Sequence, residues 1–390
     1  MAAIQTNTLT LNDAKKYIIN NIKEQIRCLK TGDRCSVALI SGPPGIGKSD
    51  LLEQIASELG FGLNAQYLGT MLIEQFGMPL PTLKENARFQ KWSDPDFFSI
   101  ENLRVKPKDP SGTIILFMDD IHLATKTIQT YFFQLLTYRS IHNKTMPGNF
   151  VMIGAGNRAK DRAGAQAILA PIVNRFYFLD IEANANDWVK NFAIPNNVRQ
   201  DIISFIEIYP DLLMSEPLES QPWASPRSWT YFSQELNQME THHELDISTI
   251  TTIGKGHIGV EYTTRFIEFV RLYLEWNPSQ FLIRGVKLPS IKDNSKMQNY
   301  TLMAAIIGEF LKNVRNENWN LQEKSIKSQI KVVQHLFDEI LEHCPEIAPL
   351  GLRSLILSDK ASKENAILYY ELTKSKPELV SAIKLMIGDE

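Results

Sequence analysis

The feature that most constrains the fold is a break rich in glycine and proline, in the stretch LISGPPGIGKSDLLEQIASEL at residues 39–59. Its spacing, Gly42-x-x-x-x-Gly47-Lys48-Ser49, fits the phosphate-binding P-loop. The apolar run before the break predicts a buried strand. Apolar residues after it recur at the spacing of an amphipathic helix: Leu51, Leu52, Ile55, Ala56 and Leu59. These flanking patterns favour a P-loop over a Gly/Pro-rich loop that only connects two elements.

Each residue type in this segment has a physical role if the loop binds phosphate. Gly42, Gly45 and Gly47 allow positive φ angles and close backbone approach, so consecutive N–H groups can converge on an anion. Lys48 would bridge the β- and γ-phosphates, and Ser49 would offer its hydroxyl to Mg²⁺. The following helix would point its positive dipole end at the phosphates. The sequence thus predicts a site for ATP and Mg²⁺. Nine residues are expected around the nucleotide: Gly42, Pro43, Pro44, Gly45, Ile46, Gly47, Lys48, Ser49 and Asp50.

Two acids follow the apolar run GTIILFMDD at residues 112–120. A buried run that ends in acids is typical of a central parallel strand with functional groups at its carboxyl end. Asp119 is expected to hold Mg²⁺ through water, beside the Ser49 hydroxyl, and Asp120 stands where a group would orient the attacking water. The alternative is that the two acids only cap the next helix.

A polar amide, Asn157, ends a further buried strand in the stretch NFVMIGAGNR. This position would let the amide touch the γ-phosphate or the attacking water. By itself a Gly-Asn pair is as typical of a turn, so the interpretation depends on the motifs that precede it.

The alternation of strands and helices predicts a doubly wound α/β domain over residues 1–181. A first helix is expected over residues 12–30, capped by Asn12, and another from Lys126 to Tyr138. NRFYFLDI is expected to be a further buried strand. The later periodicity is helical and predicts an all-helical lid domain over residues 182–275. A mostly helical C-terminal domain is expected over residues 276–390, with a polar loop at SIKDNSKMQN.

Composition places the chain among ordinary globular proteins, since 44% of its 390 residues are hydrophobic and 22% are charged. The net charge of −3 gives no overall attraction to nucleic acid or to anionic membranes. No window approaches 18 uninterrupted apolar residues, and the N-terminus lacks a signal-peptide pattern. Cys28, Cys35 and Cys344 lack metal-site spacing and are expected to be reduced thiols. We therefore expect a cytoplasmic protein with no membrane partner.

Taken in order, these motifs resemble the AAA+ ATPases, and more closely their MoxR-like and dynein-related branch, which includes versions encoded by bacteria and bacteriophages. The resemblance is carried by LFMDDIHLATKTIQTYFFQLLTYRSI and MPGNFVMIGAGNRAKDRAGAQAILAPIVNRFYFLDI, and it extends to ANANDWVKNFAI and ASPRSWTYFS. It covers roughly residues 35–275. It implies a P-loop AAA+ core with a parallel sheet, followed by a helical lid.

The resemblance also implies roles for three polar residues. Asn157 would be sensor 1, Arg175 the arginine finger that reaches a neighbour's nucleotide, and Arg227 sensor 2 on the lid. Charge reasoning agrees, because phosphoryl transfer needs cations at the γ-phosphate and a planar guanidinium suits phosphate oxygens. Taken singly, each arginine would be a surface salt-bridge partner. Three other arginines compete for the trans-acting role: Arg139, Arg158 and Arg162.

The chain departs from the family pattern at two places. Asp120 replaces the glutamate of the usual Asp-Glu pair, and residues 74–77 read Glu-Gln-Phe-Gly within the family's D-L-I-G-x-P insert. Three aromatic residues near the insert, Trp92, Phe97 and Phe98, could line a pore or contact a partner, although local core packing explains them better.

The resulting hypothesis is an ATP-hydrolysing, Mg²⁺-dependent AAA+ ring motor, expected as a homohexamer, that remodels a protein substrate or adaptor as MoxR-like chaperones do. One rival is a nucleic-acid motor or loader, for which the sequence offers neither a basic aromatic loop nor a helix-turn-helix. The second rival is a subunit whose assembly is gated by ATP with little hydrolysis, which the Asp119-Asp120 pair keeps open.

Overall fold

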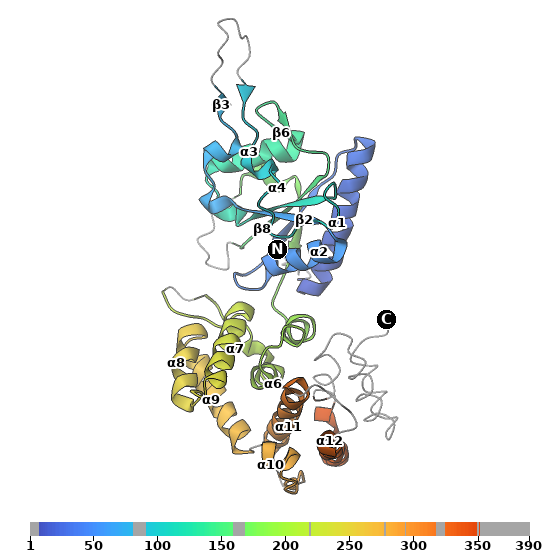
Figure 1. The fold of residues 1–390 in the computed structure, drawn as a ribbon. Helices are drawn as coiled ribbons and strands as arrows, with labels where there is room; N and C mark the ends of the chain where they lie inside the picture. The colour runs from blue at the N-terminus through green and yellow to red at the C-terminus, as the bar shows by residue number, and fades with distance from the viewer. Residues whose placement is uncertain are drawn as a thin grey trace, which may run out of the picture. The chain divides into compact units, whose positions relative to one another are not determined.

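The computed structural model describes residues 8–80, 91–158, 168–217, 220–276, 278–292, 294–316, 324–348 and 351 (Figure 1). The chain divides into two compact units, Met1–Ala183 and Asn184–Glu390. The predicted boundary at residue 275 falls inside the second unit, and the division into three domains stays a prediction.

The first unit is built on a five-stranded sheet in which every pair is parallel. Its strands lie in the order β2-β5-β8-β1-β9. Their bounds are β1 Val37–Ser41, β2 Gly62–Tyr67, β5 Ile114–Asp119, β8 Phe150–Gly156 and β9 Phe176–Asp180. This sheet confirms the predicted α/β fold. Because the strands are parallel, the loops after β1, β5 and β8 all leave from the same edge.

Helices cover both faces of this sheet (Figure 1). They are α1 Leu11–Thr31, α2 Lys48–Leu59, α3 Lys126–Tyr138 and α4 Ala170–Val173. Successive side chains of a strand point to opposite faces. Ala38 and Ile40 accordingly join the apolar cluster of α1 and α2. Val37 and Leu39 join the cluster of α3 on the other face. The bounds of α3 are those predicted, and Thr125 caps it by accepting from the N–H of Ile128 at 3.3 Å.

The described residues of the first unit also form two short antiparallel strand pairs and four 3₁₀ turns. The strand pairs join β3 Pro79–Leu80 with β4 Lys91–Trp92, and β6 Ser140–Ile141 with β7 Lys144–Thr145. The turns are η1 Leu68–Thr70, η2 Ile73–Phe76, η3 Asp96–Phe98 and η4 Ile121–Leu123.

The aromatic residues near the predicted insert pack against their own unit. Phe97 is 1% exposed and packs edge-on against Phe76, with a centroid separation of 5.3 Å. Trp92 stacks on His142 at 3.9 Å, which joins the two strand pairs. The core-packing interpretation therefore holds for Phe97, and Trp92 serves as a contact between the strand pairs.

Helix α1 begins and ends differently from the prediction. Its N-cap is Thr10, whose hydroxyl accepts from the N–H of Asp13 at 3.1 Å, so the assignment of the cap to Asn12 was wrong. Asn12 lies inside the first turn, where its side chain is past the position that can accept that bond. The helix ends at Gly32 with φ 79°, a left-handed conformation that glycine adopts without steric cost.

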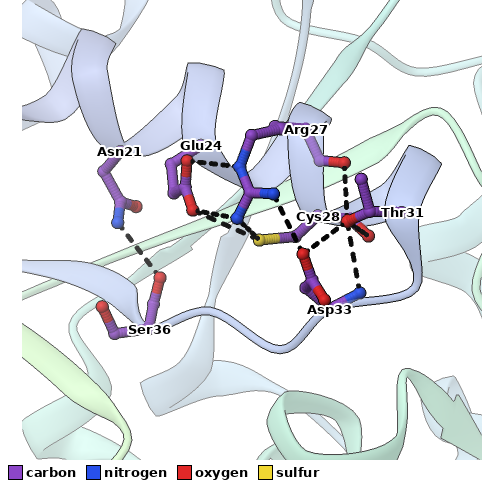
Figure 2. A network of polar contacts seen from close by, with 7 residues as sticks. All are labelled: Asn21, Glu24, Arg27, Cys28, Thr31, Asp33 and Ser36. Atoms are coloured by element: carbon purple, nitrogen blue, oxygen red, sulfur yellow. Dashed lines mark hydrogen bonds and ion pairs between the residues drawn. The ribbon is translucent and has the colours of Figure 1, made fainter.

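Polar contacts fasten the end of α1 to the chain that leads into β1 (Figure 2). Arg27 donates to Glu24 at 2.7 Å and to Asp33 at 2.9 Å, and Asn21 donates to the carbonyl of Ser36 at 3.0 Å. The buried amide of Gln25 reaches further and bonds both main-chain groups of Met152 in β8, at 2.7 and 2.8 Å.

The second unit is helical over its described residues, as predicted. Its α-helices are α5 Ala185–Trp188, α6 Gln200–Ile208, α7 Pro226–Thr241, α8 Ile247–His257, α9 Val260–Glu275, α10 Pro278–Leu282, α11 Lys296–Asn316 and α12 Lys324–His343. A π-helical turn, Val189–Ala193, follows α5, and 3₁₀ turns lie at Pro210–Leu212 and Pro345–Ile347. Phe205, Trp229 and Phe266 pack together between α6, α7 and α9. No helix among the described residues is long and apolar enough to cross a membrane.

Candidate nucleotide-binding site

The loop between β1 and α2 requires glycine at three positions. At Gly42 a Cβ atom would lie 2.8 Å from the carbonyl oxygen of Ile181, closer than real Cβ contacts, so no larger residue fits without a shift. Gly45 and Gly47 have φ angles of 79° and 106°, which L side chains rarely adopt. The loop therefore has the irregular backbone that the phosphate-binding interpretation of the sequence predicts.

Helix α2 begins at Lys48, and its N-cap residue, Gly47, has no side chain with which to cap it. The first N–H groups of a helix have no partner within the helix, and its dipole favours an anion at that end. Ile46, which is 2% exposed, anchors the loop in the apolar cluster of α1 and α2. The loop is thus fixed to the core while the helix end stays uncapped by side chains, as an anion site requires.

Lys48 extends from this helix end into a cluster of oxygen atoms. Its Nζ donates to the carbonyl oxygens of Gly42 at 2.8 Å and Pro43 at 3.0 Å, and to Oδ1 of Asn157 at 2.6 Å. The side chain is largely buried. The ammonium is therefore held at the junction between the loop and the end of β8.

Ser49 and Asp119 form the second contact between loops. The Ser49 hydroxyl donates to Oδ2 of Asp119 at 2.7 Å, and Oδ1 of Asp119 accepts from the N–H of Asp120 at 2.9 Å. Burial raises the pKa of Asp119, and the neighbouring carboxylate of Asp120 adds to that rise. The Ser49 hydrogen bond and the Lys48 charge act in the opposite direction.

The oxygens of Ser49 and Asp119 fit Mg²⁺. This ion prefers hard oxygen ligands and takes few of them from protein, with water and phosphate oxygens completing its octahedron. In the described part of the chain, no group of three or more His, Cys, Asp or Glu side chains could hold a metal. A site with one hydroxyl and one carboxylate is what a Mg²⁺ ion needs from the protein when phosphate oxygens supply further ligands.

Asp120 follows in an unusual backbone conformation. Its φ of 52° and ψ of 40° are left-handed, which aspartate tolerates better than most residues. It occupies the N-cap position of η4, but its side chain makes no capping hydrogen bond. The half-buried carboxylate of Asp120 therefore does not cap the turn that follows it, contrary to the alternative that the two acids serve only as caps.

His122 is a site residue that sequence reasoning missed. It is 1% exposed, and its Nδ1 accepts from the backbone N–H of Asn157 at 3.1 Å. Its Nε2 lies 3.2 Å from Nδ2 of Asn157. Burial lowers the pKa of this imidazole, so the ring is neutral at pH 7. The signal available in the sequence was its place three residues after Asp119, one 3₁₀ turn beyond the strand end.

The arginines proposed to act in trans lie in different environments. Arg175 is half-buried; it donates to the Pro171 carbonyl at 2.7 Å, and its guanidinium lies 4.2 Å from the ring centre of Phe133. Arg139 instead donates to the carbonyl of Phe150 at 2.6 Å and is held inside the unit.

Arg158 and Arg162 are the two remaining candidates for the trans-acting role. Arg158 pairs with Glu182 at 3.3 Å, and its side chain is 12% exposed. Arg162 lies outside the described residues. Within the described residues, Arg175 contacts a carbonyl and an aromatic ring, whereas Arg158 contacts a carboxylate.

Arg227, the residue expected to act from the lid, belongs to the second unit. It is exposed in the first turn of α7, directly after Pro226. Ser225 caps this helix by accepting from the N–H of Ser228 at 3.2 Å, and Pro226 stands in its first turn, where a missing N–H costs no helical bond.

Comparison with known proteins gives one family match and several solved structures. Residues 38–178 match the model of the family "ATPase family associated with various cellular activities (AAA)". A search of curated proteins found no match.

The solved structures that resemble the chain include RuvB from Thermotoga maritima. Its Holliday junction branch migration motor is 15% identical, with 71% of this chain and 78% of that chain covered and a TM-score of 0.36. A point mutant of the same RuvB is 16% identical over 72% and 81% of the two chains, with a TM-score of 0.35. A TM-score this low carries no conclusion about function. The family match spans the sheet from β1 to β9 and includes the strand ends that meet at the site, so residues 38–178 form an AAA-family domain.

Proposed function

We propose that this chain binds and hydrolyses ATP with Mg²⁺ and works as a homo-oligomeric ring, a hexamer, of the MoxR-like type. One observation carries the proposal. The loops after β1, β5 and β8 meet at one edge of the sheet, where Lys48 bonds Asn157 at 2.6 Å and Ser49 bonds Asp119 at 2.7 Å. This meeting places a cation, a hydroxyl, a carboxylate and an amide around an uncapped helix end.

These residues divide the work of phosphoryl transfer. The loop N–H groups and Lys48 would bind the phosphates, while Ser49 and Asp119 would hold Mg²⁺. Mg²⁺ held there would neutralise charge that develops on the phosphate oxygens. Asp120 would accept a hydrogen bond from the attacking water, and the amide of Asn157 would donate to the γ-phosphate.

The ring is supported by the AAA-family match and by the position of Arg175. Its guanidinium lies on the ring of Phe133 and donates to the carbonyl of Pro171, and these two contacts orient it. Such an arginine suits the role of a finger that completes a neighbour's site. The protein substrate or adaptor rests on the MoxR-like resemblance of the sequence.

A second candidate function, an assembly subunit gated by ATP with little hydrolysis, is favoured by Asp120. The aspartate is one methylene shorter than the glutamate usual at this position, and a misplacement of about 1 Å can cost on the order of 100-fold in rate. Slow basal turnover is therefore expected unless a partner moves the carboxylate toward the water.

A phosphate-release assay tests the proposal and separates the two candidates. Purified protein is incubated with ATP and Mg²⁺, and Lys48→Ala measures the background. Release that requires Mg²⁺ and Lys48 supports the motor. ATP-dependent assembly in sedimentation without release, with or without candidate protein partners, supports the gated subunit. If the protein shows neither ATP-dependent assembly nor phosphate release, both candidate functions are contradicted.

A further inference from the structure

The amide of Asn157 lies between two side chains that both carry hydrogen-bond donors. On one side Nζ of Lys48 is 2.6 Å from Oδ1. On the other side Nε2 of His122 is 3.2 Å from Nδ2. An amide has one oxygen, which accepts, and one NH₂ group, which donates.

The backbone of Asn157 fixes which nitrogen of His122 carries the proton. A peptide N–H can only donate, and that of Asn157 points at Nδ1 from 3.1 Å. Nδ1 must therefore be unprotonated, and the neutral ring carries its proton on Nε2. Gly156 permits this approach, because a Cβ atom there would lie 3.3 Å from Nδ1.

A conflict between donors follows. The Nε2–H of His122 faces the NH₂ group of Asn157, and neither group can accept from the other. Turning the amide over would satisfy His122, but it would bring the NH₂ group against the ammonium of Lys48, which has no acceptor. Lys48 and His122 thus compete for the single oxygen of Asn157.

We infer that His122 is a positioning residue that sets the amide orientation of Asn157 when nucleotide binds. The inference rests on the proposed ATP site. Phosphate oxygens draw the ammonium of Lys48 away from Oδ1. The amide then turns, so that Oδ1 accepts from the Nε2–H of His122. The NH₂ group is left on the side from which Lys48 has moved, where it can donate to the γ-phosphate. Nucleotide binding thereby turns the NH₂ group of Asn157 toward the γ-phosphate, where hydrolysis requires a hydrogen-bond donor.

Two substitutions at His122 separate positioning from simple support of the backbone. Asparagine can place an oxygen near the position of Nδ1 and keep the bond from the Asn157 N–H, but it has no donor near Nε2. Glutamine reaches the position of Nε2 with an NH₂ donor and gives up the acceptor near Nδ1. A backbone-support role favours His122→Asn over His122→Gln, and the amide-orienting role favours the opposite order.

We expect His122→Gln to keep kcat within about threefold of the wild-type value. His122→Asn should lower kcat about tenfold or more while KM for ATP changes less than about twofold, because one transition-state donor is misdirected. In an Asn157→Ala background His122→Asn should cause no further loss. Equal losses in the two single variants, the reverse order, or additive losses in the double variant would overturn the inference. A wild-type protein that fails to hydrolyse ATP would instead count against the proposed function.

The histidine tautomer gives a readout that does not depend on turnover. Long-range ¹H–¹⁵N spectra of the nucleotide-free protein should show His122 protonated on Nε2, and the signal is assigned by its loss in His122→Asn. The protein has seven histidines, so that assignment is practicable. On addition of a non-hydrolysable ATP analogue, the Asn157 NH₂ signals, assigned with Asn157→Ala, should shift in wild type and less in His122→Asn. A ring protonated on Nδ1 would refute the inference even if the variants folded poorly.

Discussion

Lys48 and Asn157 stand 109 positions apart in the chain and meet through a hydrogen bond of 2.6 Å between Nζ and Oδ1. The bond spans the edge of the sheet where β1 and β8 end side by side. It brings the cation of the loop and the amide of the neighbouring strand end to one point.

Lys48→Ala should weaken ATP binding at least about tenfold, because a charge-assisted contact to the phosphates is lost. Calorimetry with ATP and Mg²⁺ measures the change. Lys126→Ala is a matched control, since Lys126 is an exposed lysine at the first position of α3 in the same unit. Unchanged affinity in Lys48→Ala would contradict the P-loop assignment.

Asp119→Asn should raise the Tm of the protein free of Mg²⁺ and nucleotide at pH 7.5. Burial holds the pKa of Asp119 above its unfolded value, so the folded state keeps this proton more tightly. The stabilising contribution of the carboxyl is fully present below about pH 4 and is lost as pH rises through the folded pKa. The neutral amide avoids that loss, and the Ser49 hydroxyl can reverse its role to accept from it.

The Tm of Asp119→Asn should exceed that of wild type by about 2–4 °C for each kcal/mol that burial of the ionised carboxylate costs. Thermal melts of both proteins from pH 4 to 8 test it, and the difference in Tm should shrink toward pH 4. In the same variant Mg²⁺-dependent ATP binding should weaken, because the carboxylate ligand is gone. A variant that melts below wild type at pH 7.5 would show that the ionised carboxylate is stabilising even without the metal.

Asp120→Asn should keep ATP binding and lose the residual hydrolysis, since an amide cannot act as the base that orients water. Asparagine also tolerates the left-handed backbone at this position, so the fold should be unaffected. Phosphate release and calorimetry on the same preparation separate the two effects. Hydrolysis at the wild-type rate would mean that another group orients the water.

Asp120→Glu should preserve or increase turnover, because the added methylene restores the longer reach. The same change should destabilise the unit by about 1 kcal/mol, because glutamate is less suited than aspartate to a φ of 52°. Turnover and Tm are therefore expected to move in opposite directions. A loss of both would indicate that the strained turn, and not the reach of the carboxylate, limits the rate.

Arg175→Ala should bind ATP almost normally and hydrolyse it poorly if this arginine completes a neighbour's site. Doping the variant into wild type should depress the rate of the whole assembly more than in proportion to its fraction. Arg139→Ala is the contrast: it removes the donor to the Phe150 carbonyl, so it should lower Tm without such a disproportionate effect. Full activity of Arg175→Ala would mean that another arginine completes the neighbour's site, and Arg158 and Arg162 would be tested next.

Arg227→Ala should act within its own subunit. Its defect in hydrolysis should dilute in simple proportion when the variant is mixed with wild type, because a residue that acts in cis affects only the nucleotide of its own subunit. The exposed side chain lies in a turn already capped by Ser225, so Tm should change by less than about 1 °C. A dilution curve as steep as that of Arg175→Ala would move Arg227 into the trans-acting role.

Much of the first unit could be predicted because its signals are local. The apolar runs of β1, β5 and β8 fall where expected, and the helix predicted from Lys126 to Tyr138 has those bounds, with Thr125 as the cap that fixes its start. The P-loop glycines were predictable for the same reason, since their backbone angles follow from their own lack of a side chain.

Other features depend on contacts distant in the sequence. The strand order that puts β8 between β5 and β1 is not encoded in any one segment, and it is what brings Asn157 to Lys48. His122 escaped notice because its partner lies 35 positions away. The β6–β7 hairpin was missed although His142 and Asn143, both at positive φ, form its turn.

Two side chains of α1 bond the two strands, β1 and β8, whose ends meet at the candidate nucleotide site. Asn21 accepts from the N–H of Ala38 at 3.0 Å, and Gln25 holds Met152, so the starts of β1 and β8 are fixed by one helix. A slip of one residue along a strand is about 3.3 Å, more than the whole length of the Lys48–Asn157 bond. Substitutions at Asn21 or Gln25, which lie outside the candidate nucleotide site, are therefore expected to change the separation between Lys48 and Asn157.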